Sequence, residues 1–151
     1  MSIKFVHTNI ISKDYVKLAD FYTKVFQCEP AGKEYELYGD WLKKGANIKC
    51  AKLKGINLKL PGYEKDIPLL EIFQYDEMFD KAEPIMANRQ GFGHIAFHVD
   101  DVESILQKII SAGGSELGQI MKKEFKTGTL TFTYATDPEG NIIELQNYQA
   151  K

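Results

Sequence analysis

The chain has 151 residues, of which 44% are hydrophobic and 26% charged, and this composition fits one compact globular domain with a sizeable core. The formal net charge is −2, with no basic stripe or arginine cluster, which argues against a nucleic-acid partner. No apolar run is long enough for a membrane span, and residues 1–7 lack the apolar stretch of a signal peptide. Cys28 and Cys50 form no Cys-x-x-Cys pair. We therefore expect a cytoplasmic protein without a membrane partner.

The first predicted elements are a strand over residues 5–11 and an apolar-periodic helix that extends to Phe26. Asp14 is a suitable N-cap for this helix, because its carboxylate accepts hydrogen bonds from the free N–H groups of the first turn. The stretch that follows, residues 30–47, is longer than the corresponding stretch of the second half and carries Trp41. It is compatible with a lid, a dimer contact or a surface loop. The apolar face of the helix is predicted to comprise Val16, Leu18, Ala19, Phe21, Tyr22, Val25 and Phe26.

Three further strands are predicted before the middle of the chain, at residues 48–53, 57–60 and 69–75. The last of them carries Glu71 among aliphatic neighbours. A buried carboxylate without a partner is costly, so a glutamate at this place needs a specific reason. Residues 77–91, with a proline and several charges, form the predicted linker to the second half.

The second half begins with a predicted strand over residues 92–99 that contains His94. Asp101 is the expected N-cap of a second helix, which Gly113 and Gly114 are predicted to end. The apolar positions of this helix recur at three- and four-residue spacing, and they are Val102, Ile105, Leu106, Ile109 and Ile110.

The chain ends in a predicted β-hairpin. Residues 130–135 alternate between apolar side chains and threonine, and residues 141–148 carry Glu144 in the middle of a second strand. The segment from Asp137 to Asn141, Asp-Pro-Glu-Gly-Asn, is a strong turn signal between the two strands.

These elements describe an internal repeat of two strand–helix–strand–strand–strand modules. In both halves a histidine lies at the start of the first strand, an aspartate follows seven residues later, and a glutamate lies in the last strand. The sequence therefore predicts an α+β fold of two βαβββ modules, residues 1–76 and 92–151, joined by residues 77–91.

Two histidines and two glutamates at matched positions, His7, Glu71, His94 and Glu144, predict one metal site with two ligands from each half. Imidazole and carboxylate ligands suit a divalent ion such as zinc, nickel, cobalt, iron or manganese, and two carboxylates neutralise its charge. Four protein ligands on an octahedral ion would leave two adjacent positions for neighbouring oxygens of a substrate. His98 lies about 13 Å from His94 along the strand, too far to bind the same ion.

These residues resemble the vicinal oxygen chelate superfamily, also called the glyoxalase/bleomycin-resistance/extradiol-dioxygenase group. The resemblance covers nearly the whole chain, and its more specific blocks are Gly93-His94-Ile95-Ala96-Phe97 and Asp137-Pro138-Glu139-Gly140-Asn141-Ile142-Ile143-Glu144-Leu145. It also rests on Val6-His7-Thr8, Phe21-Tyr22-Thr23-Lys24-Val25-Phe26 and Leu70-Glu71-Ile72. The resemblance implies an open, cup-shaped mixed sheet around the metal, usually in a homodimer.

Within this superfamily, the four residues His7, Glu71, His94 and Glu144 match the metal ligands of the glyoxalase I (lactoylglutathione lyase) type. Two positions depart from that type, because Ile11 stands where an arginine is usual and Tyr75 where an asparagine is usual. The resemblance therefore implies one divalent ion, most simply nickel, cobalt or zinc, without implying a glutathione adduct as the substrate.

The expected reaction is a lyase or isomerase step on a small molecule, in which a proton moves through a metal-chelated enediolate. Glu144 is the expected base and Glu71 its partner. Two alternatives remain open: a metal-dependent dioxygenase or transferase on the same scaffold, and a non-catalytic protein that binds a drug-like molecule.

Overall fold

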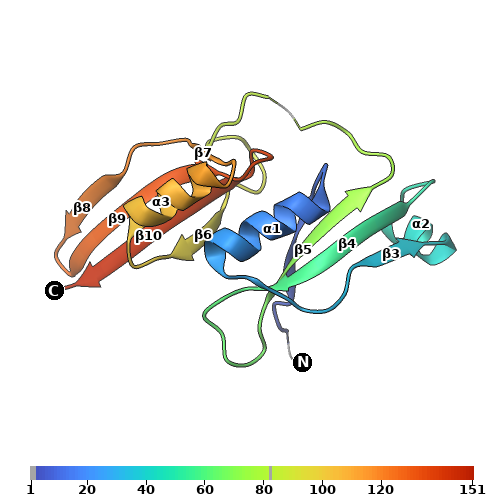
Figure 1. Cartoon of the computed structure of the whole chain (residues 1–151), viewed down its shortest axis with the longest axis horizontal. Helices are drawn as coiled ribbons and strands as arrows, with labels where there is room; N and C mark the ends of the chain where they lie inside the picture. Colours follow the sequence, from blue (N-terminus) through green and yellow to red (C-terminus); the bar gives the residue numbers. More distant parts are fainter. Residues whose placement is uncertain (1–2, 82) are drawn as a thin grey trace. The chain divides into compact units, whose positions relative to one another are not determined.

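The structure is a computed structural model, and it describes residues 3–81 and 83–151. The chain divides into two compact units, unit 1 (Met1–Lys81) and unit 2 (Ala82–Lys151), and the boundary lies within residues 77–91. Each unit contains one mixed sheet with a helix against it (Figure 1). Among the described residues, no helix is long and apolar enough to cross a membrane.

Unit 1 contains a five-stranded sheet in the order β1-β5-β4-β2, with β3 paired beside β2 on β4. β1 and β5 are parallel, and the remaining pairs are antiparallel. The parallel pair is possible because the chain between these strands crosses back over the sheet. The elements are β1 (His7–Ile11), α1 (Tyr15–Phe26), β2 (Glu29–Pro30), β3 (Tyr35–Tyr38), α2 (Asp40–Ala46), β4 (Lys52–Lys59) and β5 (Leu69–Tyr75).

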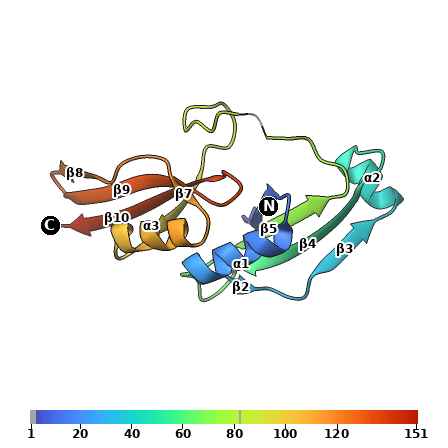
Figure 2. The same cartoon turned by 45° about the horizontal axis from the view of Figure 1, so that its top comes forward.

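Unit 2 repeats this arrangement, with strands in the order β6-β10-β9-β7 and β8 paired on β9 (Figure 2). Its first and last strands are again parallel neighbours. The predicted α+β fold of two repeated modules is thus confirmed. The elements are β6 (Ile95–His98), α3 (Val102–Ser111), β7 (Ser115–Glu116), β8 (Met121–Phe125), β9 (Gly128–Thr136) and β10 (Ile142–Ala150).

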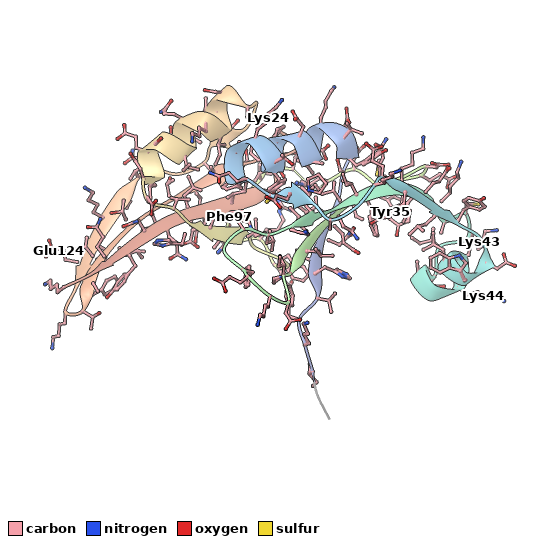
Figure 3. The ribbon with its side chains drawn as sticks, turned by 60° about the horizontal axis from the view of Figure 1, so that its bottom comes forward. Lys24, Tyr35, Lys43, Lys44, Phe97 and Glu124 are labelled. Atoms are coloured by element: carbon pink, nitrogen blue, oxygen red, sulfur yellow. The ribbon has the colours of Figure 1, made fainter. Side chains whose placement is uncertain are left out.

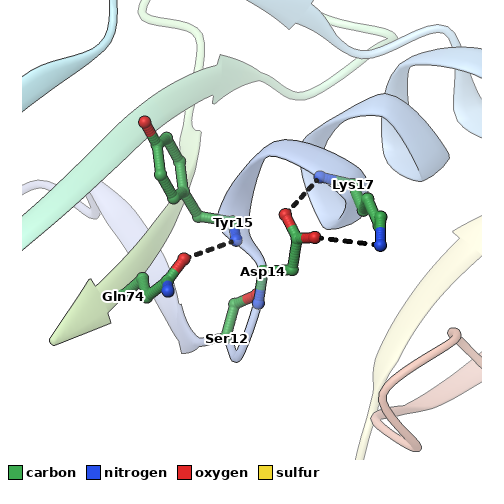
Figure 4. A network of polar contacts seen from close by, with 5 residues as sticks. All are labelled: Ser12, Asp14, Tyr15, Lys17 and Gln74. Atoms are coloured by element: carbon green, nitrogen blue, oxygen red, sulfur yellow. Dashed lines mark hydrogen bonds and ion pairs between the residues drawn. The ribbon is translucent and has the colours of Figure 1, made fainter. Parts of the chain in front are cut away.

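Both predicted N-caps are confirmed. Asp14 accepts a hydrogen bond from the Lys17 N–H at 3.1 Å, and Asp101 accepts one from the Ser104 N–H at 3.0 Å. Figure 4 shows the start of α1, where the Gln74 side chain of β5 also accepts a hydrogen bond from the Tyr15 N–H. These contacts end each first strand and begin each helix at the same place in the repeat.

The helices pack through apolar faces that differ from the prediction at the start of α1 and at two positions of α3, where Ile105 is only partly buried and Ile110 is exposed. Val16 is half exposed because it lies on the solvent side of α1, whereas Tyr15 is buried in its place. Ile110 is 40% exposed near the end of α3, and Ile109 is fully buried. The buried faces are Tyr15, Leu18, Ala19, Phe21, Tyr22, Val25 and Phe26 in α1, and Val102, Leu106 and Ile109 in α3.

The middle of unit 1 corrects two strand predictions. Residues 48–53 and 57–60 do not form two strands, because one continuous strand, β4, covers residues 52–59. Residues 48–51 instead form a turn, in which the Ala51 N–H donates to the Ile48 carbonyl. In unit 2, the strand predicted at residues 130–135 is longer and extends over Gly128–Thr136 as β9. The strand before it, β8, was not predicted, because its five side chains are all exposed and show no apolar face.

Residues 30–47, which the sequence left open, form part of the fold of unit 1. β3 pairs with β4 as β8 pairs with β9 in unit 2, so it is a regular member of the repeat. α2 adds a second small core, in which Leu42, Ala51 and Leu53 are buried and Tyr35, Leu37, Phe73 and Tyr75 pack against them.

Candidate metal-binding site

In unit 1 the fold brings together His7 and Glu71, which are 64 positions apart. The Nε2 atom of His7 lies 3.2 Å from Oε2 of Glu71. In the register of β1 and β5, His7 is paired with Leu69 and Asn9 is paired with Glu71. His7 therefore lies two positions before Asn9, the residue opposite Glu71. Residues two apart on a strand point to the same face, which explains the contact.

Unit 2 contains the same pair. The Nε2 atom of His94 lies 2.9 Å from Oε2 of Glu144. His94 directly precedes β6, and β6 pairs Ala96 with Glu144, so the histidine again lies two positions before the partner of the glutamate. The repeat therefore preserves the relative place of an imidazole and a carboxylate as well as the strand order.

The two pairs are accessible, and their donor set suits a metal ion. The glutamate side chains are each 16% exposed, and those of His7 and His94 are 43% and 34% exposed. Neutral imidazole nitrogen and carboxylate oxygen are the donors that borderline divalent ions prefer. Within the described parts of each unit, no further His, Cys, Asp or Glu joins the pair to make a group of three. Each unit therefore holds one His–Glu pair.

Glu71 is flanked by an amide side chain on each neighbouring strand. Asn9 on β1 and Asn57 on β4 are its register partners, and Asn9 Nδ2 donates to the Glu71 carbonyl at 3.4 Å. The hydroxyl of Tyr35 donates to Asn57 Oδ1 at 2.6 Å. Burial, followed by the negative charge of Glu71, raises the pKa of Tyr35 to about 12, so this hydroxyl remains a donor at neutral pH.

The surroundings of Glu144 are more apolar. Its register partners are Ala96 on β6 and Tyr134 on β9. The Tyr134 ring lies with its centroid 5.2 Å from that of His94, and the Phe132 ring lies 6.1 Å further along. The two units thus share a His–Glu pair, but amides surround one pair and aromatic rings the other.

The predicted turn between β9 and β10 sets the position of Glu144. The buried Asp137 accepts hydrogen bonds from the N–H groups of Glu139 and Asn141 and from the Asn141 side chain, at 2.7 to 2.9 Å. Gly140 has a φ of +78°, a backbone conformation that residues with a side chain rarely adopt. This turn fixes the hairpin register, which pairs Glu144 with Tyr134.

A sequence profile of the Glyoxalase/Bleomycin resistance protein/Dioxygenase superfamily matches residues 4–145. The chain belongs to this superfamily. Two curated relatives named "Probable lactoylglutathione lyase" are similar over part of the chain, one from Vibrio parahaemolyticus at 43% identity over 63 residues and one from Synechocystis at 38% over 61 residues. The matched segments span 42% and 45% of these relatives and about two fifths of this chain, 39% and 40%.

A glyoxalase superfamily fold is also found among solved structures. A glyoxalase family protein from Bacillus cereus superposes with a TM-score of 0.81 at 14% identity, over 99% of this chain and 97% of that one. At this identity the similarity concerns the fold alone. It agrees with the family assignment made from the sequence.

Sequence reasoning missed the residues that surround the two pairs. Tyr35 gave no signal, because it lies in residues 30–47, where the sequence predicts no strand. Tyr134 could have been found, since the predicted hairpin places it opposite Glu144. His98 pairs with Gln146, two residues along the strands from the Ala96–Glu144 pair.

Proposed function

We propose that this glyoxalase superfamily member is a metal-dependent lyase or isomerase that moves a proton between neighbouring carbons of a small substrate carrying two adjacent oxygens. The observation that carries the proposal is the His–Glu pair at the same register position of both modules. A pair conserved by the repeat in two different surroundings indicates a shared chemical requirement, because packing alone would not demand it. The superfamily assignment and the lyase names of the two relatives support the reaction class.

In this proposal His7, Glu71, His94 and Glu144 together hold one divalent ion, with nickel, cobalt or zinc as the expected identity. An ion held by these residues would supply positive charge next to the carbon that loses its proton. The two carboxylates offset the charge of the ion, and strands rather than loops carry three of the four ligands.

Glu144 is the proposed base that accepts the proton, and Glu71 is its partner on the return step. A carboxylate accepts a proton best when few groups stabilise its charged form. The two glutamates differ in their cross-strand neighbours, which are Ala96 and Tyr134 for Glu144 but the amides Asn9 and Asn57 for Glu71, and this difference favours Glu144 for the role of base.

The ligand set is tested by measuring the metal content of protein purified without chelator. We expect about one divalent ion per chain, a large loss of that ion in His7→Ala and His94→Ala, and no loss in His98→Ala, which removes the third histidine of the chain. Equal metal content in all three variants would contradict the assignment.

The reaction is tested by solvent deuterium exchange into α-hydroxy carbonyl adducts, including the glutathione adduct, and into acyl thioesters. Glu144→Gln should abolish exchange while leaving metal binding detectable and the circular dichroism spectrum unchanged. Full exchange in this variant would remove Glu144 from the role of base. Ile11 and Tyr75, at positions where the glyoxalase I type carries arginine and asparagine, make non-glutathione adducts equally important probes.

A second candidate function, non-catalytic binding of an aromatic molecule, is favoured by the rings of Tyr134 and Phe132 beside His94. The two functions differ in their dependence on metal. A binding protein would retain its affinity for an aromatic ligand after treatment with a chelator, whereas the proposed enzyme would lose all exchange activity.

A further inference from the structure

A hydrogen bond between two side chains lies opposite Glu71 in the sheet of unit 1. The Tyr35 hydroxyl on β3 donates to Asn57 Oδ1 on β4 at 2.6 Å (Tyr35 is labelled in Figure 3). Asn57 and Glu71 are directly opposite in the antiparallel β4–β5 pair. Side chains in such positions share a face of the sheet, with Cβ atoms about 5 Å apart, so the Asn57 amide is within reach of the carboxylate.

The position of Tyr35 is set by packing. Its register partner is Gly55, and its ring meets the ring of Phe73 edge to face, with centroids 6.1 Å apart and planes at 85°. A Cβ on Gly55 would lie 2.8 Å from the Phe73 ring, so the missing side chain provides the space into which Phe73 packs. The two rings therefore fix the direction of the Tyr35 hydroxyl.

The hydrogen bond also fixes the direction of the Asn57 amide. A tyrosine hydroxyl that donates to the carbonyl oxygen of an amide leaves the two hydrogens on Nδ2 for another acceptor. Glu71 is the register partner of Asn57, and its negative charge contributes to the raised pKa of Tyr35. An amide between a hydroxyl and a carboxylate is best oriented with its N–H groups toward the carboxylate.

We propose that Tyr35 and Asn57 are positioning residues that hold the Glu71 carboxylate as an acidic ligand of the metal site while Glu144 accepts the proton. This inference rests on the proposed function. It also gives a reason for the difference between the two His–Glu pairs, because Tyr134 and Ala96 beside Glu144 provide no comparable amide. Glu144 is therefore the carboxylate that can leave the ion and act as the base. A ligand held by its neighbours binds metal more tightly, because less freedom is lost on binding.

The test is a set of dissociation constants for Zn²⁺, measured by calorimetric titration of metal-depleted protein. Tyr35→Phe retains the ring that packs on Phe73 and removes only the hydroxyl, and Asn57→Leu removes the amide at similar size. We expect each variant to weaken Zn²⁺ binding about 10- to 100-fold, as loss of a group that orients a ligand typically does. The double variant should be no weaker than Asn57→Leu alone, since both residues act through one amide.

The matched control is Tyr15→Phe. The Tyr15 hydroxyl donates to Glu34 at 2.7 Å, so this variant also loses a tyrosine hydrogen bond in the same unit, but one that involves neither Asn57 nor Glu71. Its Zn²⁺ affinity should equal that of the wild type. The thermal midpoints of all variants, measured without metal, separate an effect on affinity from a general loss of stability.

The outcomes separate the two proposals. If the wild type binds none of Zn²⁺, Ni²⁺ and Co²⁺ in such titrations, both the proposed function and the positioning role are overturned. If the wild type binds Zn²⁺ but Tyr35→Phe binds within twofold of it, only the positioning role is overturned. A loss of affinity in Tyr15→Phe as large as in Tyr35→Phe would also overturn it, because the effect would then be structural.

Discussion

The buried carboxylate of Asp137 is predicted to be the main support of the turn that positions Glu144. Asp137 is 1% exposed, and its carboxylate accepts hydrogen bonds from the main-chain N–H groups of Glu139 and Asn141 and from the Asn141 side chain. Asp137→Ala leaves these three donors without their acceptor. A hydrogen bond to a charged group contributes about 1.5–3 kcal/mol. Because Pro138 is exposed and water can reach the edge of the turn, we reduce the sum and expect a loss of about 3 kcal/mol.

Urea unfolding followed by circular dichroism measures this effect. With an m-value of about 2 kcal/mol/M, a loss of about 3 kcal/mol lowers the midpoint by about 1.5 M. Asp137→Asn is the informative control, because it keeps an oxygen for the two main-chain donors and sets an N–H group against the Asn141 side chain. The free energy of unfolding of Asp137→Asn should lie between those of the wild type and Asp137→Ala. A stability for Asp137→Ala within about 0.5 kcal/mol of the wild type would refute the assigned role of the turn.

Three further predictions concern unit 1. Gly55→Ala should destabilise by about 1–3 kcal/mol in urea unfolding, because the added Cβ would lie 2.8 Å from the Phe73 ring, and an unchanged midpoint would contradict this packing. Burial raises the pKa of Cys28 to about 11, so iodoacetamide at pH 8 should label the exposed Cys50 in native protein, and Cys28 only after unfolding, as mass spectrometry of peptides would reveal. The Lys17 N–H lowers the pKa of the Asp14 carboxyl in the folded protein. The contribution of Asp14 to stability is therefore full above the pKa of the unfolded state and is lost as the pH falls through the pKa of the folded state. The difference in unfolding free energy between the wild type and Asp14→Ala should shrink below about pH 4 and stay constant near neutrality.

Features that depend on local chemistry were predicted well from the sequence. The N-caps Asp14 and Asp101 and the Asp137 turn each depend on groups within a few residues of one another, so their signal is contained in a short segment. The repeat was visible because both modules keep a histidine, a capping aspartate and a glutamate in the same order. These features were sufficient for the fold class and for the superfamily.

Features that depend on which strands become neighbours were predicted poorly. β8 has no apolar face and is a strand only because β9 lies beside it. β3 was not predicted within residues 30–47, because its pairing with β4 spans a helix and a turn. The break between the two strands predicted at residues 48–60 does not exist, since pairing with β5 continues through Gly55 and Ile56.

The sequence by itself determined that two histidines and two glutamates recur in a duplicated module, because side-chain type and spacing are written in the chain. Only the tertiary structure decided that each histidine lies about 3 Å from its glutamate, at 3.2 and 2.9 Å, since that contact depends on the parallel register of strands far apart in sequence. It alone also decided that Tyr35 and Asn57 lie beside Glu71 while Tyr134 lies beside Glu144. Register across a sheet is set by the packing of the whole module, so no local pattern could reveal these neighbours.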